Sequence, residues 1–284
     1  MREPISVQNN RSNGNTGPFG LFLQQIAAAH LFEAAATVSY YLLFSIFPFL
    51  MFLGAAAASL KLNESAGWFR RIGVLPEKAL ELLRSYFFDM SEHPSWIFLG
   101  FVLSVSPLGK AIGVIKRRVR LAYHSNPDIN PFFEWIISIV FVLLILFSLY
   151  GLLLLNVIGE KLYEMIRTFP PLYWITPSTL QTSRIILCGL FVFFVVFGIN
   201  YVLPATHLQK RDTLPGTAFS VIAMLLFSRL FSYYVDQLNG LSSIYGSLGG
   251  VIILLSWLFL FSFLLLFGSQ INAFLYKRKR EVIF

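Results

Sequence analysis

Ionisable side chains inside apolar stretches are the first candidates for chemistry, because a charge is costly in hydrocarbon. Arg229 lies in such a stretch, and Asp236 follows seven residues later on about the same face of a helix. Counting from Arg211 at about 1.5 Å per residue places Arg229 roughly 27 Å along the helix, in the outer part of a bilayer. The pattern predicts an anion site, with Arg184 as a second cation. The alternative is an arginine that snorkels to the outer interface.

Lys110 follows Ser106-Pro107 near the inner end of another apolar stretch. The proline is expected to break or kink the helix and to free backbone carbonyl groups. Freed backbone at membrane depth is tolerated mainly beside protein or a wet cavity, which favours a substrate site at Lys110. The alternative is a kinked helix end at which Lys110 joins the basic run 116–120.

Uncharged polar side chains also interrupt the apolar stretches. Tyr40 and Tyr41 fall in the first stretch, where they would either line a substrate path or hydrogen-bond to a neighbouring helix. Asn200 and Gln270 lie in later stretches, and the same two interpretations apply to their amides. Two pairs of glycines have a spacing that allows close helix packing, either within the chain or in a dimer: Gly109 with Gly113, and Gly246 with Gly250.

Near the start of the first stretch, His30 and Glu33 predict either a proton relay or the wet face of an interfacial helix, since His titrates near neutrality. Two basic runs, 116–120 and 277–280, would either bind RNA or fix the topology and attract anionic lipid headgroups. We expect no nucleic acid partner, because short basic runs beside apolar stretches are typical of membrane topology.

Few features of this sequence favour an enzyme. The 14 Asp and Glu residues are scattered, and the four His residues lie in different segments without a spacing such as His-x-x-x-His. The chain has one Cys and no Walker motif, which excludes a disulfide framework within the chain and ATP hydrolysis by a P-loop. We therefore predict no catalytic residues, no metal site and no cofactor.

These residues belong to a chain whose composition favours a membrane protein. Hydrophobic residues make up 56% of it, charged residues 13%, and the mean hydropathy is +0.69. A water-soluble fold of this length could not hide so much apolar surface. Stretches of about 20 apolar residues, the length of a membrane-spanning helix, occur near 35–60, 95–115, 133–155, 185–204, 214–235 and 248–275.

The sequence thus predicts an all-α, polytopic membrane protein with six transmembrane helices in one domain, 18–276. A disordered cytoplasmic tail, 1–17, precedes it, and a basic cytoplasmic tail, 277–284, follows it. The stretch from Pro18 predicts an N-terminal interfacial helix, and the stretch from Pro76 predicts an amphipathic helix in the first extracytoplasmic loop. Lys and Arg gather in the short loops on the side of the termini, which places both termini in the cytoplasm.

Three groups of motifs, in one order along residues 20–276, resemble a known family. The first is Ala36-Thr-Val-Ser-Tyr-Tyr-Leu-Leu-Phe-Ser-Ile-Phe-Pro48. The second is Tyr201-Val-Leu-Pro204 with Arg211-Asp-Thr-Leu-Pro-Gly216, and the third is Tyr245-Gly-Ser-Leu-Gly249 followed by Trp257, Gly268 and Asn272. The chain resembles the YihY/BrkB family of bacterial inner-membrane proteins, which implies six spans and a location in the bacterial cytoplasmic membrane.

The resemblance implies less about activity. Members are labelled virulence or serum-resistance factors, some are suspected of exporting or flipping lipids, and the older label ribonuclease BN is regarded as a misassignment. Tyr245 would then lie at an unwound entry to the last span, where backbone is accessible to a ligand. Many members carry a Glu in Gly-Ala-Glu-x-Asn-Ala, whereas this chain reads Gly268-Ser-Gln-Ile-Asn-Ala273, which argues against a role that needs a carboxylate there.

We therefore expect a transporter or flippase-like protein for an amphipathic or lipid-like substrate, with membrane lipids as partners. A non-transporting scaffold for envelope assembly is the alternative, and a ribonuclease is the least favoured interpretation. A dry, fully packed bundle would favour the scaffold, and a groove or cavity that reaches the midplane would favour transport. The sequence leaves open the substrate, the direction and energy coupling of transport, and whether the chain forms a homo-oligomer or binds an envelope protein.

Overall fold

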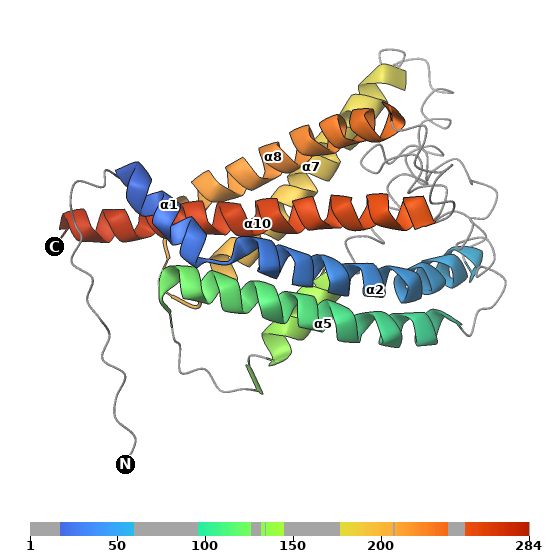
Figure 1. Cartoon of the computed structure of the whole chain (residues 1–284). Coiled ribbons are helices and arrows are strands. Elements are labelled where there is room, and N and C mark those ends of the chain that lie inside the picture. Colours follow the sequence, from blue (N-terminus) through green and yellow to red (C-terminus); the bar gives the residue numbers. More distant parts are fainter. Residues whose placement is uncertain are drawn as a thin grey trace, which may run out of the picture.

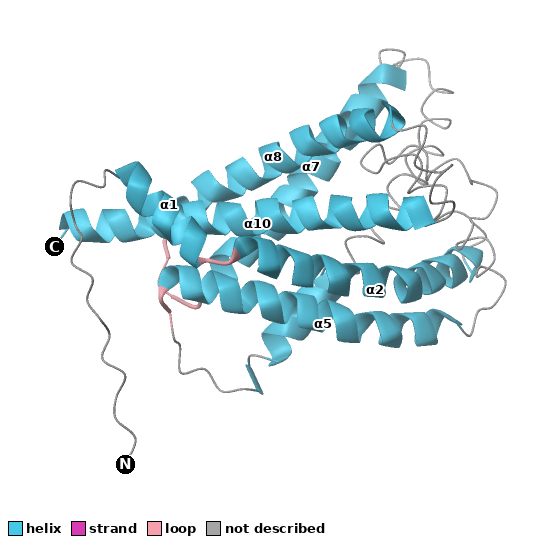
Figure 2. Ribbon diagram, viewed as in Figure 1, coloured by secondary structure: helices cyan, strands magenta, loops and turns pink. Residues whose placement is uncertain are grey.

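The computed structural model describes residues 18–59, 96–125, 132–133, 135–144, 177–206, 208–237 and 248–283. These ranges consist of helices and short turns, and no strand occurs in them (Figure 2). The all-α class predicted from the sequence is therefore confirmed for this part of the chain. The principal helices are α1 (Pro18–Ala28), α2 (Leu31–Ser59), α5 (Trp96–Tyr123), α7 (Pro177–Val202), α8 (Lys210–Gln237) and α10 (Leu248–Ile283).

Four helical stretches in the described ranges are long and apolar enough to cross a membrane: Leu31–Phe49, Phe98–Tyr123, Lys210–Val235 and Leu248–Arg280. Two shorter apolar helices, Trp135–Leu144 and Gly189–Val202, fall where the third and fourth spans are predicted. The structure thus supports a polytopic membrane protein, while the count of six spans stays a prediction.

The helices form one side-by-side bundle (Figure 1). α2 lies along α5 with opposite direction, α10 packs against α2 and α8, and α7 packs against α8. Fully buried apolar side chains between them form the core, including Val38, Ile112, Leu203, Val235, Leu254 and Leu266. Large apolar side chains also cover the outside, where Phe98 is 75% exposed and Ile222 is 66% exposed. Such a surface needs a lipid environment, because water would not wet it.

Helices α8 and α10 approach each other closely at two glycines, Gly216 and Gly268. A Cβ added to Gly216 would lie 2.0 Å from the Gly268 carbonyl oxygen, and one added to Gly268 would lie 2.5 Å from the Gly216 carbonyl oxygen. Gly109 and Gly113 were expected to pack closely either within the chain or in a dimer. Packing within the chain is not found among the described residues, because a Cβ at either meets nothing within 4 Å, and the dimer contact stays a prediction. Gly246 of the other predicted pair lies outside the described residues.

One expectation about helix continuity needs correction. α5 continues through Pro107 and ends two turns beyond the predicted limit at residue 115, so the proline does not break the helix beside Lys110. α10 continues as a helix to Ile283, so the basic run 277–280 is helical, and its place in a cytoplasmic tail stays a prediction. The predicted tail 1–17 and the predicted amphipathic helix from Pro76 both lie outside the described residues.

The predicted N-terminal helix is present as α1 and packs on α10. The Phe22 ring lies 6.0 Å from the Phe267 ring and 5.2 Å from the Phe274 ring. A turn separates α1 from α2, and in it His30 adopts a left-handed conformation with φ 46°. α1 is therefore fixed to the flank of α10, and its depth in the bilayer stays a prediction.

Candidate functional site

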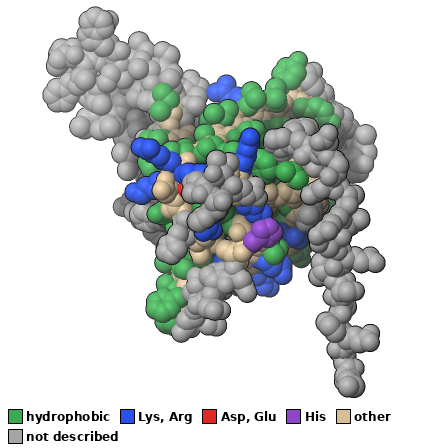
Figure 3. Space-filling view, turned by 90° about the vertical axis from the view of Figure 1, so that its left-hand side faces the viewer, with side chains coloured by type: hydrophobic (Ala, Val, Ile, Leu, Met, Phe, Trp, Pro, Cys, Tyr) green, Lys and Arg blue, Asp and Glu red, His purple; other side chains and the backbone are tan. Residues whose placement is uncertain are grey.

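Basic side chains gather at one end of the bundle, which we call the basic end. Helices α2 and α8 begin at this end, and α1 lies beside it (Figure 1). Helices α5, α7 and α10 end there. Figure 3 views this end directly and shows Lys and Arg side chains over much of its described surface. The basic end consists of Lys116, Arg117, Arg118, Arg120, Lys210, Arg211, Lys277, Arg278, Lys279 and Arg280.

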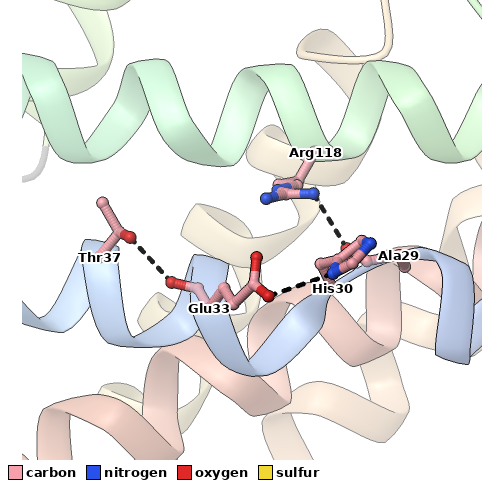
Figure 4. A network of polar contacts seen from close by, with 5 residues as sticks. All are labelled: Ala29, His30, Glu33, Thr37 and Arg118. Atoms are coloured by element: carbon pink, nitrogen blue, oxygen red, sulfur yellow. Dashed lines mark hydrogen bonds and ion pairs between the residues drawn. The ribbon is translucent and has the colours of Figure 1, made fainter.

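The basic run of α5 connects this helix to three other parts of the bundle. Arg118 Nη1 donates to the Ala29 carbonyl just after α1, at 3.2 Å (Figure 4). Arg120 Nε donates to the Leu203 carbonyl just after α7, at 3.3 Å, and Lys116 donates to Ser138 of the shorter apolar helix Trp135–Leu144. Cations at helix C-termini are stabilising because they meet carbonyl dipoles. These residues thus have structural partners that the sequence pattern did not reveal.

His30 and Glu33 contact each other at the start of α2. The His30 Nδ1 and Glu33 Oε1 atoms lie 3.2 Å apart, with 59% and 71% of the two side chains exposed. Thr37 donates its hydroxyl hydrogen bond to the Glu33 carbonyl, one turn back along the same helix (Figure 4). The contact is therefore local and exposed, which suits the wet face of a helix better than a buried relay.

Lys110 is exposed on the outer flank of α5. Its Nζ lies 5.8 Å from the centre of the Tyr41 ring of α2, within reach of a cation–π contact. Arg117 is also exposed and lies seven residues further along α5, about 10 Å towards the basic end and on nearly the same helix face. Because Gly109 and Gly113 carry no side chains and open onto free space, nothing from them crowds Lys110.

We call Ser106, Lys110, Gly113 and Arg117 of α5 the α5 track. Ser106 is exposed like Lys110 and Arg117, so the track presents polar groups on the outside of a membrane-spanning helix. Tyr40 of α2 is 51% exposed, and its ring lies 4.6 Å from the Phe44 ring on the same helix. Tyr40 therefore lies on the outer surface, whereas the partly buried Tyr41 borders Lys110.

Asn200 belongs to a buried polar network between α7, α8 and α10. Its Nδ2 donates to Thr217 Oγ1 at 3.1 Å, and its Oδ1 accepts a bond from Ser269 at 2.7 Å. Asn272 completes the network, because its Oδ1 accepts the Gly216 backbone N–H at 2.6 Å and its Nδ2 donates to the Thr213 carbonyl at 2.9 Å. These amides join helices, as such groups do in membrane bundles.

Gln270 is buried and faces α1. It accepts a hydrogen bond at Oε1 from Gln25 Nε2, at 2.9 Å, so a neutral amide pair joins α1 to α10. Asn200 and Gln270 therefore have geometry suited to fixing helices, and neither lies on the α5 track.

Arg229 is exposed on α8, a helix that lies on the other side of α10 and α2 from α5 (Figure 1). A Cβ at Gly189 of α7 would lie 3.6 Å from Leu225 of α8, so the backbones of Arg184 and Arg229 lie at about the same level of these antiparallel helices. The side chains of Arg184 and Asp236 are outside the described set, as is the whole of Tyr245. An anion site among these residues stays a prediction.

An acidic contact at the basic end was also missed from the sequence. Asp212, in the first turn of α8, accepts the Gln209 backbone N–H at 3.2 Å and pairs with Lys279 of α10 at 2.8 Å. The helix dipole explains why a carboxylate is favourable there. An acidic residue shortly after the start of a helix is a signal for a cap, but its partner on α10 is far away in the sequence and could not be predicted.

Apolar helices with exposed apolar flanks and a basic end define a polytopic membrane protein. The sequence model of the family described as Virulence factor BrkB matches residues 22–282. The chain therefore belongs to the BrkB family, which confirms the resemblance drawn from its motifs.

Relatives of this chain carry names that differ in kind. A Bacillus subtilis (strain 168) protein named Putative ribonuclease-like protein YfkH is 28% identical over 253 residues, covering 87% of this chain and 90% of its own length. A UPF0761 membrane protein of Vibrio campbellii (strain ATCC BAA-1116) is 26% identical over 87 residues, 31% of this chain and 28% of its own length. Another UPF0761 membrane protein, from Paraburkholderia xenovorans (strain LB400), is 35% identical over 78 residues, covering 27% of this chain and 18% of its own length. No solved structure matches the chain.

Proposed function

We propose that this protein is a transporter or flippase-like protein of the bacterial inner membrane, which moves an amphipathic, lipid-like substrate along the flank of its helix bundle. One observation carries the proposal: Lys110 is exposed on a membrane-spanning helix about 10 Å inside Arg117, beside the Tyr41 ring and next to open space at Gly109 and Gly113. A polar group in such a position is costly in lipid unless something polar meets it.

The packing of the described core favours the flank over a central path. Gly216 and Gly268 bring the α8 and α10 backbones into contact, and the amides of Asn200 and Asn272 have partners on neighbouring helices. A polar headgroup on the α5 track would stay near its cationic partners while its chains remain in the surrounding lipid. Arg229, on α8, would offer a second cation towards the opposite end of the bundle.

Reconstitution in liposomes tests this proposal. Purified protein is inserted into vesicles that contain a labelled anionic phospholipid, and transfer between leaflets is compared for the wild type, Lys110→Ala and Arg229→Ala. Arg278→Ala is the matched control, because it removes an exposed cation from the basic end and leaves the α5 track intact. We expect slower transfer for Lys110→Ala and Arg229→Ala and unchanged transfer for the control. Wild-type rates in well-inserted Lys110→Ala protein would overturn the role of the track.

A scaffold for envelope assembly is the second candidate, and the buried network of α7, α8 and α10 favours it. Hydrogen bonds join Asn200, Thr217 and Ser269 as well as Asn272 and Thr213, as expected of a rigid bundle. Absence of lipid movement with the wild-type protein would favour this candidate. The ribonuclease-like name belongs to the Bacillus relative, and the prediction that this chain is not an enzyme stands on its scattered acidic residues.

A further inference from the structure

We infer that the α5 track is a docking site for a single anionic phospholipid, which it takes from the leaflet at the basic end. The phosphate would lie between Lys110 and Arg117, and the acyl chains would follow the apolar continuation of the same helix flank. This inference rests on the proposed function and deepens it, because the bound lipid would be the starting point of transport.

The neighbouring cations of α5 are engaged elsewhere. Lys116 donates to Ser138, Arg118 to the Ala29 carbonyl and Arg120 to the Leu203 carbonyl. Lys110 and Arg117 are exposed on the strip of the helix between these contacts, and the described contact of Lys110 is with the face of the Tyr41 ring. Three cations of α5 thus join parts of the bundle, and these two are exposed on its surface.

Carboxylates do not neutralise these two cations in the described part of the chain. Glu33 and Asp212 are the acidic residues whose side chains the structure describes. Glu33 contacts His30, and Asp212 pairs with Lys279. A ligand with a phosphate would therefore meet two cations that neither described carboxylate pairs with, and each cation near a membrane surface attracts an anionic lipid by about 1 kcal/mol.

The shape of the flank also fits a lipid. Gly109 and Gly113 leave open space beside Lys110, where the headgroup and glycerol would lie. Beyond Ser106, away from the basic end, the same flank of α5 presents Leu103 and Leu99, which are 47% and 48% exposed. The helix thus changes from cationic to apolar along one face, in the order that a phospholipid requires.

Binding is measured on the full-length protein in a neutral detergent. The probes are a short-chain phosphatidylglycerol, a short-chain phosphatidylcholine and sodium glycerophosphate, and the readout is the apparent Kd from thermal stabilisation. The variants are Lys110→Gln, Arg117→Gln and Gly113→Leu, with Arg278→Gln as the control of equal charge change. Gly113→Leu keeps both cations and fills the open space, where a side chain clashes with nothing within 4 Å at its Cβ.

We expect phosphatidylglycerol to stabilise the wild type more than phosphatidylcholine does, and glycerophosphate to have little effect. Lys110→Gln and Arg117→Gln should each weaken phosphatidylglycerol binding by about fivefold, Gly113→Leu should weaken it as well, and Arg278→Gln should leave it unchanged. Equal weakening by Arg278→Gln would show that the whole basic end attracts the lipid and would overturn the site. Equal stabilisation by glycerophosphate would show that the site binds a phosphate group without acyl chains, and would overturn the proposal that its ligand is a lipid.

The two proposals fail separately. Lipid binding that depends on Lys110, without any movement of lipid between leaflets, leaves the docking site standing and overturns the transport function. Lipid transfer by wild type and Lys110→Gln alike, with no loss of binding in the variant, overturns the docking site and leaves transport by another path.

Discussion

The contact between α8 and α10 provides the sharpest quantitative prediction, through Gly216→Ala. The added Cβ would lie 2.0 Å from the Gly268 carbonyl oxygen and 2.6 Å from Asn272 Oδ1, so α8 and α10 must separate by roughly an ångström. Overpacking of this kind costs about 1–3 kcal/mol. The separation also weakens the two hydrogen bonds of Asn272 to α8, each worth about 0.6 kcal/mol in a membrane bundle. We expect a loss of about 2–4 kcal/mol in the free energy of unfolding.

The assay is unfolding in mixed micelles, in which the fraction of sodium dodecyl sulfate is raised and helix content is followed by circular dichroism. Gly113→Ala is the matched control, because the same methyl group meets nothing within 4 Å and alanine favours a helix by up to about 1 kcal/mol. The control should be as stable as the wild type or more stable. Gly216→Ala protein with wild-type stability would refute the close crossing, as would an equal loss for Gly113→Ala.

Two further predictions concern polar contacts between helices. In a double-mutant cycle of Gln25→Ala and Gln270→Ala, the amide pair should give a coupling energy of about 0.6 kcal/mol in the same unfolding assay. Strictly additive losses of stability would show that this pair does not fix α1 to α10. Arg120→Gln should lower stability by about 1 kcal/mol, because a charged donor to the Leu203 carbonyl is lost at the end of α7; a thermal melt superimposable on that of the wild type would contradict this joint.

The helical class and four of the spans were predictable from hydropathy, because a membrane-spanning helix must be long and apolar along its whole length. The ends of the helices were less predictable. α5 continues past Pro107 and through its basic run, and α10 continues through Lys277–Arg280. A helix can contain charged residues, so hydropathy alone does not show where the helix ends.

The partners of the polar residues depended on tertiary structure. Asn200 and Gln270 were visible as costly groups in apolar stretches, but their bonds to Thr217 and Gln25 connect helices far apart in sequence. The glycine motif at Gly109 and Gly113 was misleading for the same reason. A spacing of four residues places two glycines on one face of a helix, and it does not show whether that face meets a neighbour or open space.

Lys110 illustrates both sides of this comparison. Its position inside an apolar stretch marked it as a candidate, and the two interpretations, a substrate site or a member of the basic run, could not be separated without the fold. The structure shows that Lys116, Arg118 and Arg120 turn towards other helices, whereas Lys110 lies on the outer flank beside Tyr41.

Photocrosslinking at position 110 tests the account most directly. Lys110→p-benzoyl-phenylalanine protein is irradiated in native membranes and the adducts are identified by mass spectrometry, with Val119→p-benzoyl-phenylalanine as the buried control on the same helix. We predict phospholipid adducts at position 110 and none at position 119. A crosslink from position 110 to another segment of the protein, without lipid adducts, would contradict an open, lipid-facing α5 track.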